Sequence, residues 1–262
     1  MTDLLTQFSN AALDGFTSRR SALGQAGKLG AAAALAAIPF LKPGRAQAQS
    51  MSGDFGILNY ALTLEYLERS FYRQAEATGL IASADAPLFD TIREDEEQHV
   101  TLLAGAITDA GGTPVVYTDA DFTFDPFLDS YDTIKVLAQG LEDTGVRAYK
   151  GQAAAIMDRE RAGGYLTVAL QIHSVEARHA AAIRRLNGNQ GWIPGAQPNA
   201  PAPIAPVYAG EDNVTQGGVN LSTALTGYTS DDLTEAFDEP LTMDQVLAIA
   251  GPFITGEEGD ED

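Results

Sequence analysis

The sequence predicts an all-α protein: a four-helix bundle with one long crossover, followed by a proline-rich C-terminal extension that ends in a short helix. Three observations predict this fold. Apolar residues recur every three or four positions in four segments of residues 54–187, which is the period of an amphipathic helix. One glutamate interrupts each of the four apolar stripes. From residue 188 the composition changes to proline, asparagine, alanine and glycine, so residues 188–262 are expected to form an extension packed on the bundle.

The first two helices are expected to form an antiparallel pair. The first has Asp54 as its N-cap and stops at Gly79. The second opens at Asp85, carries Pro87 in its first turn, and stops at Gly111. The short loop between them leaves room only for an antiparallel neighbour.

A long crossover separates this pair from the second pair. Residues 113–131 have no helical period but contain enough apolar side chains to lie across the bundle surface. Asp132 is expected to cap the third helix, whose apolar stripe runs to Ile156. Two glycines at 163 and 164 then break the chain before the fourth helix, which ends at Asn187.

The extension is expected to begin as an extended segment, because five prolines fall within residues 194–206. Its apolar side chains Trp192, Val207 and Tyr208 are expected to pack it onto the bundle. The short terminal helix is expected to start after Thr242 as its N-cap and to end at the next glycine.

The glutamates on the stripes, together with two histidines, form a candidate metal site. Residues three apart project from the same helix face, so a Glu-x-x-His pair can direct a carboxylate and an imidazole at one ion. Buried carboxylates without cations would be costly. Oxygen and imidazole ligands suit two Fe or two Mn ions, with mixed Fe/Mn or Zn left open. The six candidate ligands are Glu65, Glu96, His99, Glu142, Glu176 and His179.

Within this set Glu65 and Glu142 are expected to be terminal ligands, whereas Glu96 and Glu176 bridge the two ions. Four further residues are candidates to contact the ligands: Glu68, Tyr72, Tyr149 and His173. The alternatives are an exposed Glu68 paired with Arg69 or Tyr72, tyrosines that belong to the core, and a His173 that is hydrogen-bonded elsewhere. Three more acidic residues lie off the stripe and are expected on the solvated face, namely Glu94, Asp95 and Glu97.

Charge and cysteine content exclude several functions. The formal net charge of −20 argues against a nucleic acid or an anionic membrane surface as partner, because both would repel the protein. The chain has no cysteine, which excludes disulfides, thiolate metal sites and thiol nucleophiles.

The N-terminus predicts export. An arginine pair, Arg19 and Arg20, precedes a weakly apolar run at residues 29–41, and Ala46-Gln47-Ala48 follows. This pattern is typical of a twin-arginine signal peptide and is too short for a transmembrane span. We expect residues 1–48 to be removed and the protein to be exported already folded, to the periplasm or the extracytoplasmic cell envelope.

The ligand motifs carry a resemblance to known proteins. The ordered motifs Leu64-Glu65-Tyr66-Leu67-Glu68, Glu96-Glu97-Gln98-His99, Glu142 and Glu176-Ala177-Arg178-His179 resemble those of the ferritin-like superfamily of di-iron and di-manganese carboxylate proteins. More narrowly, the chain is similar to the exported ferritin-like domain family that includes desiccation-related proteins. The resemblance covers residues 54–187, and the segments 237–242 and 250–253 also look like that family's C-terminal region.

The resemblance implies a ferritin-like four-helix bundle with O2 or H2O2 as a small-molecule substrate. An oxidase, peroxidase or manganese-catalase-like activity in oxidative or desiccation stress would follow. One alternative is a non-enzymatic envelope or desiccation-related protein whose metal site is structural or vestigial, and another is iron binding or storage. A homo-oligomer or a cell-envelope partner is left open.

Overall fold

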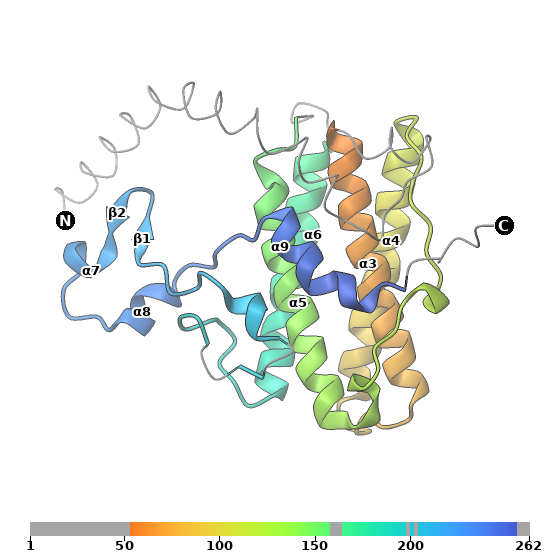
Figure 1. Ribbon diagram of the computed structural model, residues 1–262, viewed down its shortest axis with the longest axis horizontal. Coiled ribbons are helices and arrows are strands. Elements are labelled where there is room, and N and C mark those ends of the chain that lie inside the picture. Colours follow the sequence, from red (N-terminus) through yellow and green to blue (C-terminus); the bar gives the residue numbers. More distant parts are fainter. Residues whose placement is uncertain (1–52, 158–163, 198–199, 202–203, 256–262) are drawn as a thin grey trace.

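Four long helices form the bundle in this computed structural model, which describes residues 53–157, 164–197, 200–201 and 204–255 (Figure 1). The predicted export signal, residues 1–48, lies outside the described residues. Helix α3 packs mainly on α4 and α5 mainly on α6, while α3 and α5 meet between the pairs. The predicted four-helix architecture is therefore confirmed. The four helices are α3 (Gly53–Ala77), α4 (Ala86–Asp109), α5 (Tyr131–Ala153) and α6 (Tyr165–Leu186).

Two predicted N-caps are wrong. Asp54 lies inside the first turn of α3, where its carboxylate accepts a hydrogen bond of 2.8 Å from the Met157 backbone N–H. Ser130, and not Asp132, caps α5, because its hydroxyl accepts from the Thr133 backbone N–H at 3.2 Å. A serine and an aspartate are equally good caps, so sequence alone could not choose between neighbouring candidates.

The end of α5 also differs from the prediction. The helix stops at Ala153, so Ile156 lies beyond it, although its side chain is buried in the core. Ile156 therefore joins the apolar core from the loop and not from the helix stripe.

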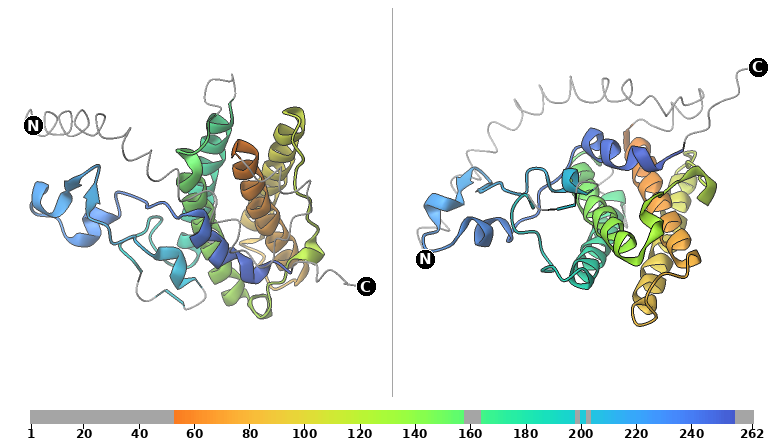
Figure 2. Two further views of the ribbon diagram at one scale, coloured as in Figure 1. Left: turned by 45° about the horizontal axis from the view of Figure 1, so that its top comes forward. Right: turned by 60° about the horizontal axis from the view of Figure 1, so that its bottom comes forward.

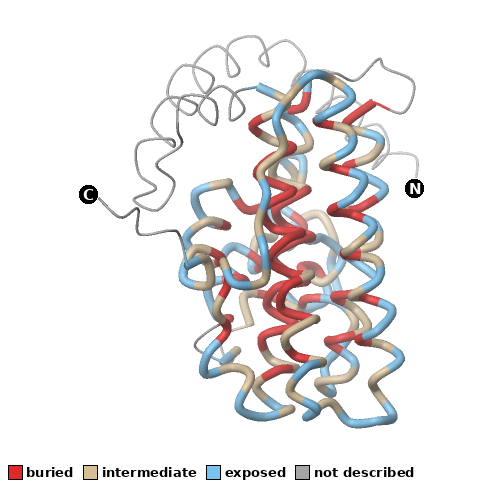
Figure 3. Tube along the Cα trace, turned by 90° about the vertical axis from the view of Figure 1, so that its right-hand side faces the viewer, coloured by how far each residue is buried: buried red, intermediate tan, exposed pale blue. Residues whose placement is uncertain are grey.

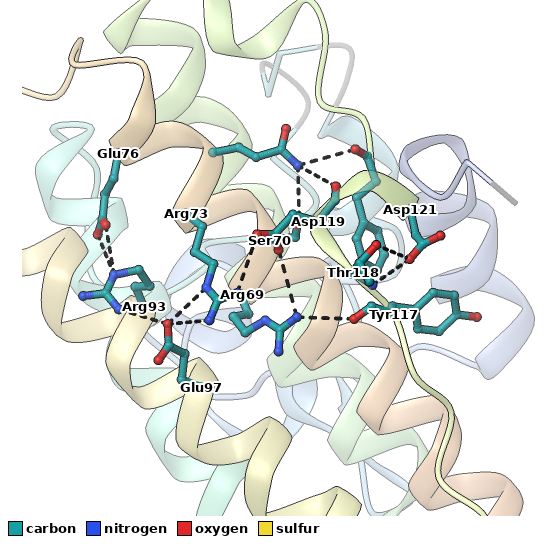
Figure 4. Close-up of polar contacts among 12 residues, drawn as sticks. Arg69, Ser70, Arg73, Glu76, Arg93, Glu97, Tyr117, Thr118, Asp119 and Asp121 are labelled. Carbon is teal, nitrogen blue, oxygen red and sulfur yellow. Dashed lines mark hydrogen bonds and ion pairs between the residues drawn. The ribbon is translucent and has the colours of Figure 1, made fainter.

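The crossover lies on the bundle surface, as predicted, where it contacts α3, and it includes two short 3-10 turns, η2 (Asp119–Asp121) and η3 (Phe127–Asp129). Polar side chains of α3 hold its backbone (Figure 4). The Gln74 amide donates to the Asp119 carbonyl at 3.1 Å, and Arg69 donates to the Tyr117 carbonyl at 3.4 Å. The bond from Arg69 satisfies the Tyr117 carbonyl, whereas the Asp119 carbonyl also accepts from the Phe122 backbone N–H at the end of η2.

The C-terminal extension contains more regular structure than predicted. A hairpin of two-residue strands pairs β1 (Thr215–Gln216) with β2 (Val219–Asn220) in antiparallel register. Two short helices, α7 (Leu221–Ala224) and α8 (Ser230–Thr234), follow, and η4 (Ala205–Tyr208) forms a 3-10 turn in the segment expected to be extended. The hairpin and these two helices stand to one side of the bundle (Figures 1 and 2).

The predicted terminal helix is α9 (Met243–Ala250), which lies across the bundle next to α5 and is followed by η5 (Gly251–Phe253) (Figure 2). Thr242 is its N-cap, as predicted, and forms a capping box with Gln245. Val246 and Ala250 are buried against the bundle core. The apolar face of this short helix thus has the docking surface that its composition requires.

A buried arginine of α5 holds the extension on the bundle. The Arg147 guanidinium donates to the carbonyls of Val207, Ala209 and Glu239, and it lies 3.0 Å from the Glu211 carboxylate. Arg147 and Glu211 are both almost fully buried. One side chain therefore ties together two separate segments of the extension, residues 207–211 and the chain at Glu239.

The backbone of the extension also passes very close to the backbone of α5, at Gly151. A Cβ atom at Gly151 would lie 1.9 Å from the Leu241 carbonyl oxygen, so only glycine fits there. Val207 and Tyr208 are buried as predicted. Trp192 contacts the bundle only at its surface: it is 44% exposed, the Arg185 guanidinium of α6 lies over its ring, and its Nε1–H donates a hydrogen bond to the Glu235 carboxylate.

The core fills the space between the helices along most of their length (Figure 3). In the middle of this apolar core sits a group of buried carboxylates and imidazoles. No helix in the described part of the chain is long and apolar enough to span a membrane.

Candidate metal centre

The six predicted ligand residues come together between the four helices. α3 and α5 each supply one glutamate, and α4 and α6 each supply a glutamate and a histidine. All four glutamates are completely buried, whereas His99 and His179 keep 8% and 6% of their surface exposed. The imidazoles therefore form the side of the cluster that is nearest to solvent.

The donor atoms fall into two overlapping groups. One consists of Glu65, Glu96, His99 and Glu176, and the other of Glu96, Glu142, Glu176 and His179; the donor atoms of each group lie within 4.8 Å of one another. Glu96 and Glu176 belong to both groups. This is the arrangement that two ions sharing two bridging carboxylates would need.

The histidines direct their Nδ1 atoms into the cluster. His99 Nδ1 lies 3.0 Å from both Glu65 Oε2 and Glu96 Oε2, and 3.3 Å from Glu176 Oε1. His179 Nδ1 lies 3.1 Å from Glu96 Oε1 and 3.4 Å from Glu142 Oε2. Glu96 thus turns one oxygen toward each histidine.

Several of these close approaches lack hydrogen-bond geometry. Both oxygens of Glu176, Oε1 of Glu96, Oε2 of Glu142 and Nδ1 of His179 are buried without a hydrogen bond. Buried polar atoms are nearly always hydrogen-bonded, so a group of exceptions at one place needs an explanation. Their lone pairs converge on a common space, which fits the donor set of divalent metal ions.

The pKa values of three members of the cluster, Glu96, Glu176 and His179, are raised. Burial and the neighbouring carboxylates raise the pKa of Glu176 well above its ordinary value, and burial raises that of Glu96 to about 7. Burial lowers the pKa of His179, but Glu142 and the other carboxylates outweigh this effect and raise it to about 12. The surroundings thus favour added positive charge, which divalent ions would supply in place of protons.

Two tyrosines hold the terminal glutamates in a crossed pattern. The Tyr72 hydroxyl of α3 donates to Glu142 of α5, and the Tyr149 hydroxyl of α5 donates to Glu65 of α3. Each tyrosine follows the glutamate of its own helix by seven residues. Both tyrosines therefore contact the candidate ligands, and each helix orients the carboxylate of the other.

Glu68 is buried beside the cluster and is not an exposed partner of Arg69 or Tyr72. Burial and the Glu176 carboxylate raise its pKa well above the ordinary value. Gly145 of α5 provides the space: a Cβ atom there would lie 2.9 Å from Glu176 Oε2 and 3.0 Å from Glu68 Oε1. Glu68 and Gly145 each stand three residues after the terminal glutamate of their helix. The two positions are therefore equivalent, but α3 has a carboxylate side chain there and α5 has none.

Asp95 contacts the cluster although it was predicted to lie on the solvated face. Its carboxylate lies 3.1 Å from His179 Nε2 and can accept a hydrogen bond from it, an arrangement that orients Nδ1 toward the glutamates. No signal on α4 reveals this role, because the partner histidine belongs to α6. Glu94 is exposed as predicted, and Glu97 forms ion pairs with Arg73 and Arg93.

His173 lies away from the cluster. Burial and the charge of Lys150 lower its pKa, and Asp238 acts in the opposite direction. Its neighbours are thus the end of α5 and the C-terminal extension, and its Nε2 is buried without a hydrogen bond to any described residue, so the alternative of a hydrogen bond elsewhere stays a prediction.

Comparison with known families agrees with this architecture. A comparison with curated proteins finds no match to the chain. The family model of the ferritin-like domain matches residues 53–189, which include all four bundle helices and all six candidate ligands. The chain therefore belongs to the ferritin-like domain family.

Proposed function

We propose that the protein binds two iron or two manganese ions in the bundle core and uses them to react with O2 or H2O2 outside the cytoplasm. The observation that carries this proposal is the convergence of six buried donor side chains, several of whose polar atoms lack a hydrogen bond. Membership of the ferritin-like domain family supports the same conclusion. An oxidase, peroxidase or catalase-like role in oxidative or desiccation stress would follow.

In this proposal Glu65 and His99 hold one ion, and Glu142 and His179 hold the other. Glu96 and Glu176 would help to hold both ions, because each belongs to both donor groups. Two redox-active ions held together can supply or accept two electrons, the number that converts O2 to H2O2 or H2O2 to water.

The protein's own residues set the conditions for this chemistry. Tyr72 and Tyr149 fix the carboxylates of Glu142 and Glu65, and Asp95 fixes the imidazole of His179. Complete burial of the glutamates excludes bulk water and strengthens the electrostatic interactions between ligand and ion. The slightly exposed imidazole side gives protons and polar reactants a short path from solvent.

The test is metal analysis after reconstitution of the metal-free full-length chain with Fe(II), Mn(II) or redox-inactive Zn(II). We expect two bound ions per chain, with Fe(II) oxidised by O2, or H2O2 consumed, only when iron or manganese is present. The variant Glu142→Gln is expected to bind one ion or fewer, whereas Glu94→Gln is the matched control, since Glu94 is exposed on α4.

Fewer than one ion in the wild-type protein, unchanged in Glu142→Gln, would exclude the proposed site. Two ions that raise the melting temperature without any turnover of O2 or H2O2 would instead favour a structural metal site.

Export by the twin-arginine route is a separate part of the proposal and is supported by the N-terminal sequence alone. Replacing Arg19 and Arg20 by lysine should keep the protein in the cytoplasm of its host. Unchanged export of this variant, measured by cell fractionation, would contradict the proposed route.

A further inference from the structure

A small apolar cavity adjoins the candidate metal centre. Its walls include Leu64 of α3, Leu103 of α4, Tyr149 of α5 and Ala169 of α6, so all four bundle helices contribute. The lining is almost wholly apolar, and the space has room for about one small molecule. A cavity of this kind is dry and takes up small apolar molecules.

The cavity lies one helical turn from the ligands. Ala61, another wall residue, precedes Glu65 by four residues, and Leu103 follows His99 by four. One turn of helix is about 5.4 Å long. The ring of Tyr149 forms part of the wall while its hydroxyl donates to Glu65, so this side chain joins the cavity to the ligand layer.

One buried polar group of the wall has no partner. Tyr60 is only 3% exposed, and its hydroxyl makes no hydrogen bond with any described residue. A buried hydroxyl without a partner is costly and offers a donor to a molecule held beside it.

The two sides of the metal centre therefore differ in the reactants they admit. H2O2 would lose its hydrogen bonds to water on entering an apolar cavity, whereas O2 has almost none to lose. On the opposite side the edges of His99 and His179 reach solvent next to Asp95, which is 36% exposed.

We propose that this cavity is a holding site for dioxygen beside the metal centre, with Tyr60 as part of its wall. This inference rests on the proposed function, and it selects O2 over H2O2 as the reactant that uses the cavity. Polar reactants and protons use the imidazole side.

The first test needs no metal: xenon binding to the metal-free full-length protein, measured by xenon NMR or in a pressurised crystal. We expect xenon in the wild-type cavity, none in Ala169→Leu, which fills it, and tighter binding in Leu103→Ala, which enlarges it. No xenon in the wild-type protein and in Leu103→Ala would overturn the inference and leave the metal site untouched.

The second test uses the iron-loaded protein in stopped flow. In Ala169→Leu the reaction with O2 should slow about tenfold while the reaction with H2O2 keeps its rate, and Leu103→Ala should not slow either one. Equal slowing of both reactions, or an unchanged O2 rate in a variant that has lost xenon, would refute the role of the cavity. If the wild-type protein reacts with neither oxidant, the proposed function fails while the xenon result still stands.

Discussion

Replacement of Gly145 by alanine should weaken metal binding without destabilising the metal-free helix α5. Gly145 lies inside α5, where alanine would normally stabilise the helix by about 1 kcal/mol. The added methyl group would lie 2.9 Å from Glu176 Oε2 and 3.0 Å from Glu68 Oε1. Overpacking of this kind costs about 1–3 kcal/mol.

The size of the effect depends on whether the carboxylates can move. Without metal they are the free ends of flexible side chains, so they shift and the overpacking cost is small. With metal, Glu176 is fixed by its ions in the proposed site, and the full cost falls on the metal-bound state. A penalty of about 1–3 kcal/mol corresponds to a loss of about 5- to 150-fold in metal affinity.

Gly105→Ala is the matched control, because Gly105 lies inside α4 and a Cβ atom there would have no neighbour within 4 Å. We expect this control to raise the melting temperature by about 2–4 °C with or without metal. Gly145→Ala should melt slightly above the wild-type temperature without metal, but it should gain less from added Fe(II) or Mn(II), and chelator competition should show weaker binding. Wild-type metal affinity in Gly145→Ala would refute the reasoning.

Three further predictions test other parts of the structure. The folded-state pKa of Glu96 is raised from 4.5 to about 7, so the metal-free folded protein binds the Glu96 proton more tightly than the unfolded chain does. The stability gained from this proton is complete below pH 4.5 and is lost as the pH rises toward 7. The urea midpoint measured with chelator should therefore be lower at pH 8 than at pH 5, and a higher midpoint at pH 8 would contradict the prediction. Arg147→Met leaves Glu211 buried without its cation and should lower the free energy of unfolding, measured in urea titrations, by about 3–5 kcal/mol. The double variant with Glu211→Leu should recover most of this loss. No recovery would show that the loss comes from the carbonyl contacts of Arg147. Asp95→Asn should weaken metal binding by about 10- to 100-fold in chelator competition, since the aspartate orients His179, and wild-type affinity would show that the contact is dispensable.

The helices and the ligand faces were predictable because both are local properties of the sequence. The apolar period places Glu65 on the inner face of α3 whatever the rest of the chain does, and the Glu-x-x-His spacing aligns Glu96 with His99 on α4. Two-fold repetition of the pattern then indicates which faces meet.

Other features depend on neighbours that are distant in the chain. Asp95 has a role only because α6 brings His179 beside it, and Arg147 only because two segments of the extension supply carbonyl groups. The β1–β2 hairpin was a missed local signal: Gly217 and Gly218 both have positive φ, and a Gly-Gly pair is typical of a tight hairpin turn.

The repeated halves of the bundle are not identical around the proposed ions. Glu68 of α3 faces the space left by Gly145, its counterpart on α5, and Asp95 of α4 corresponds in position to Val175 of α6. Two ions bound here would therefore have the same ligand types but different electrostatic surroundings. Loading should proceed in two steps of unequal affinity, and a di-iron form should give two distinct Mössbauer doublets, so that one position can exchange its metal while the other keeps it.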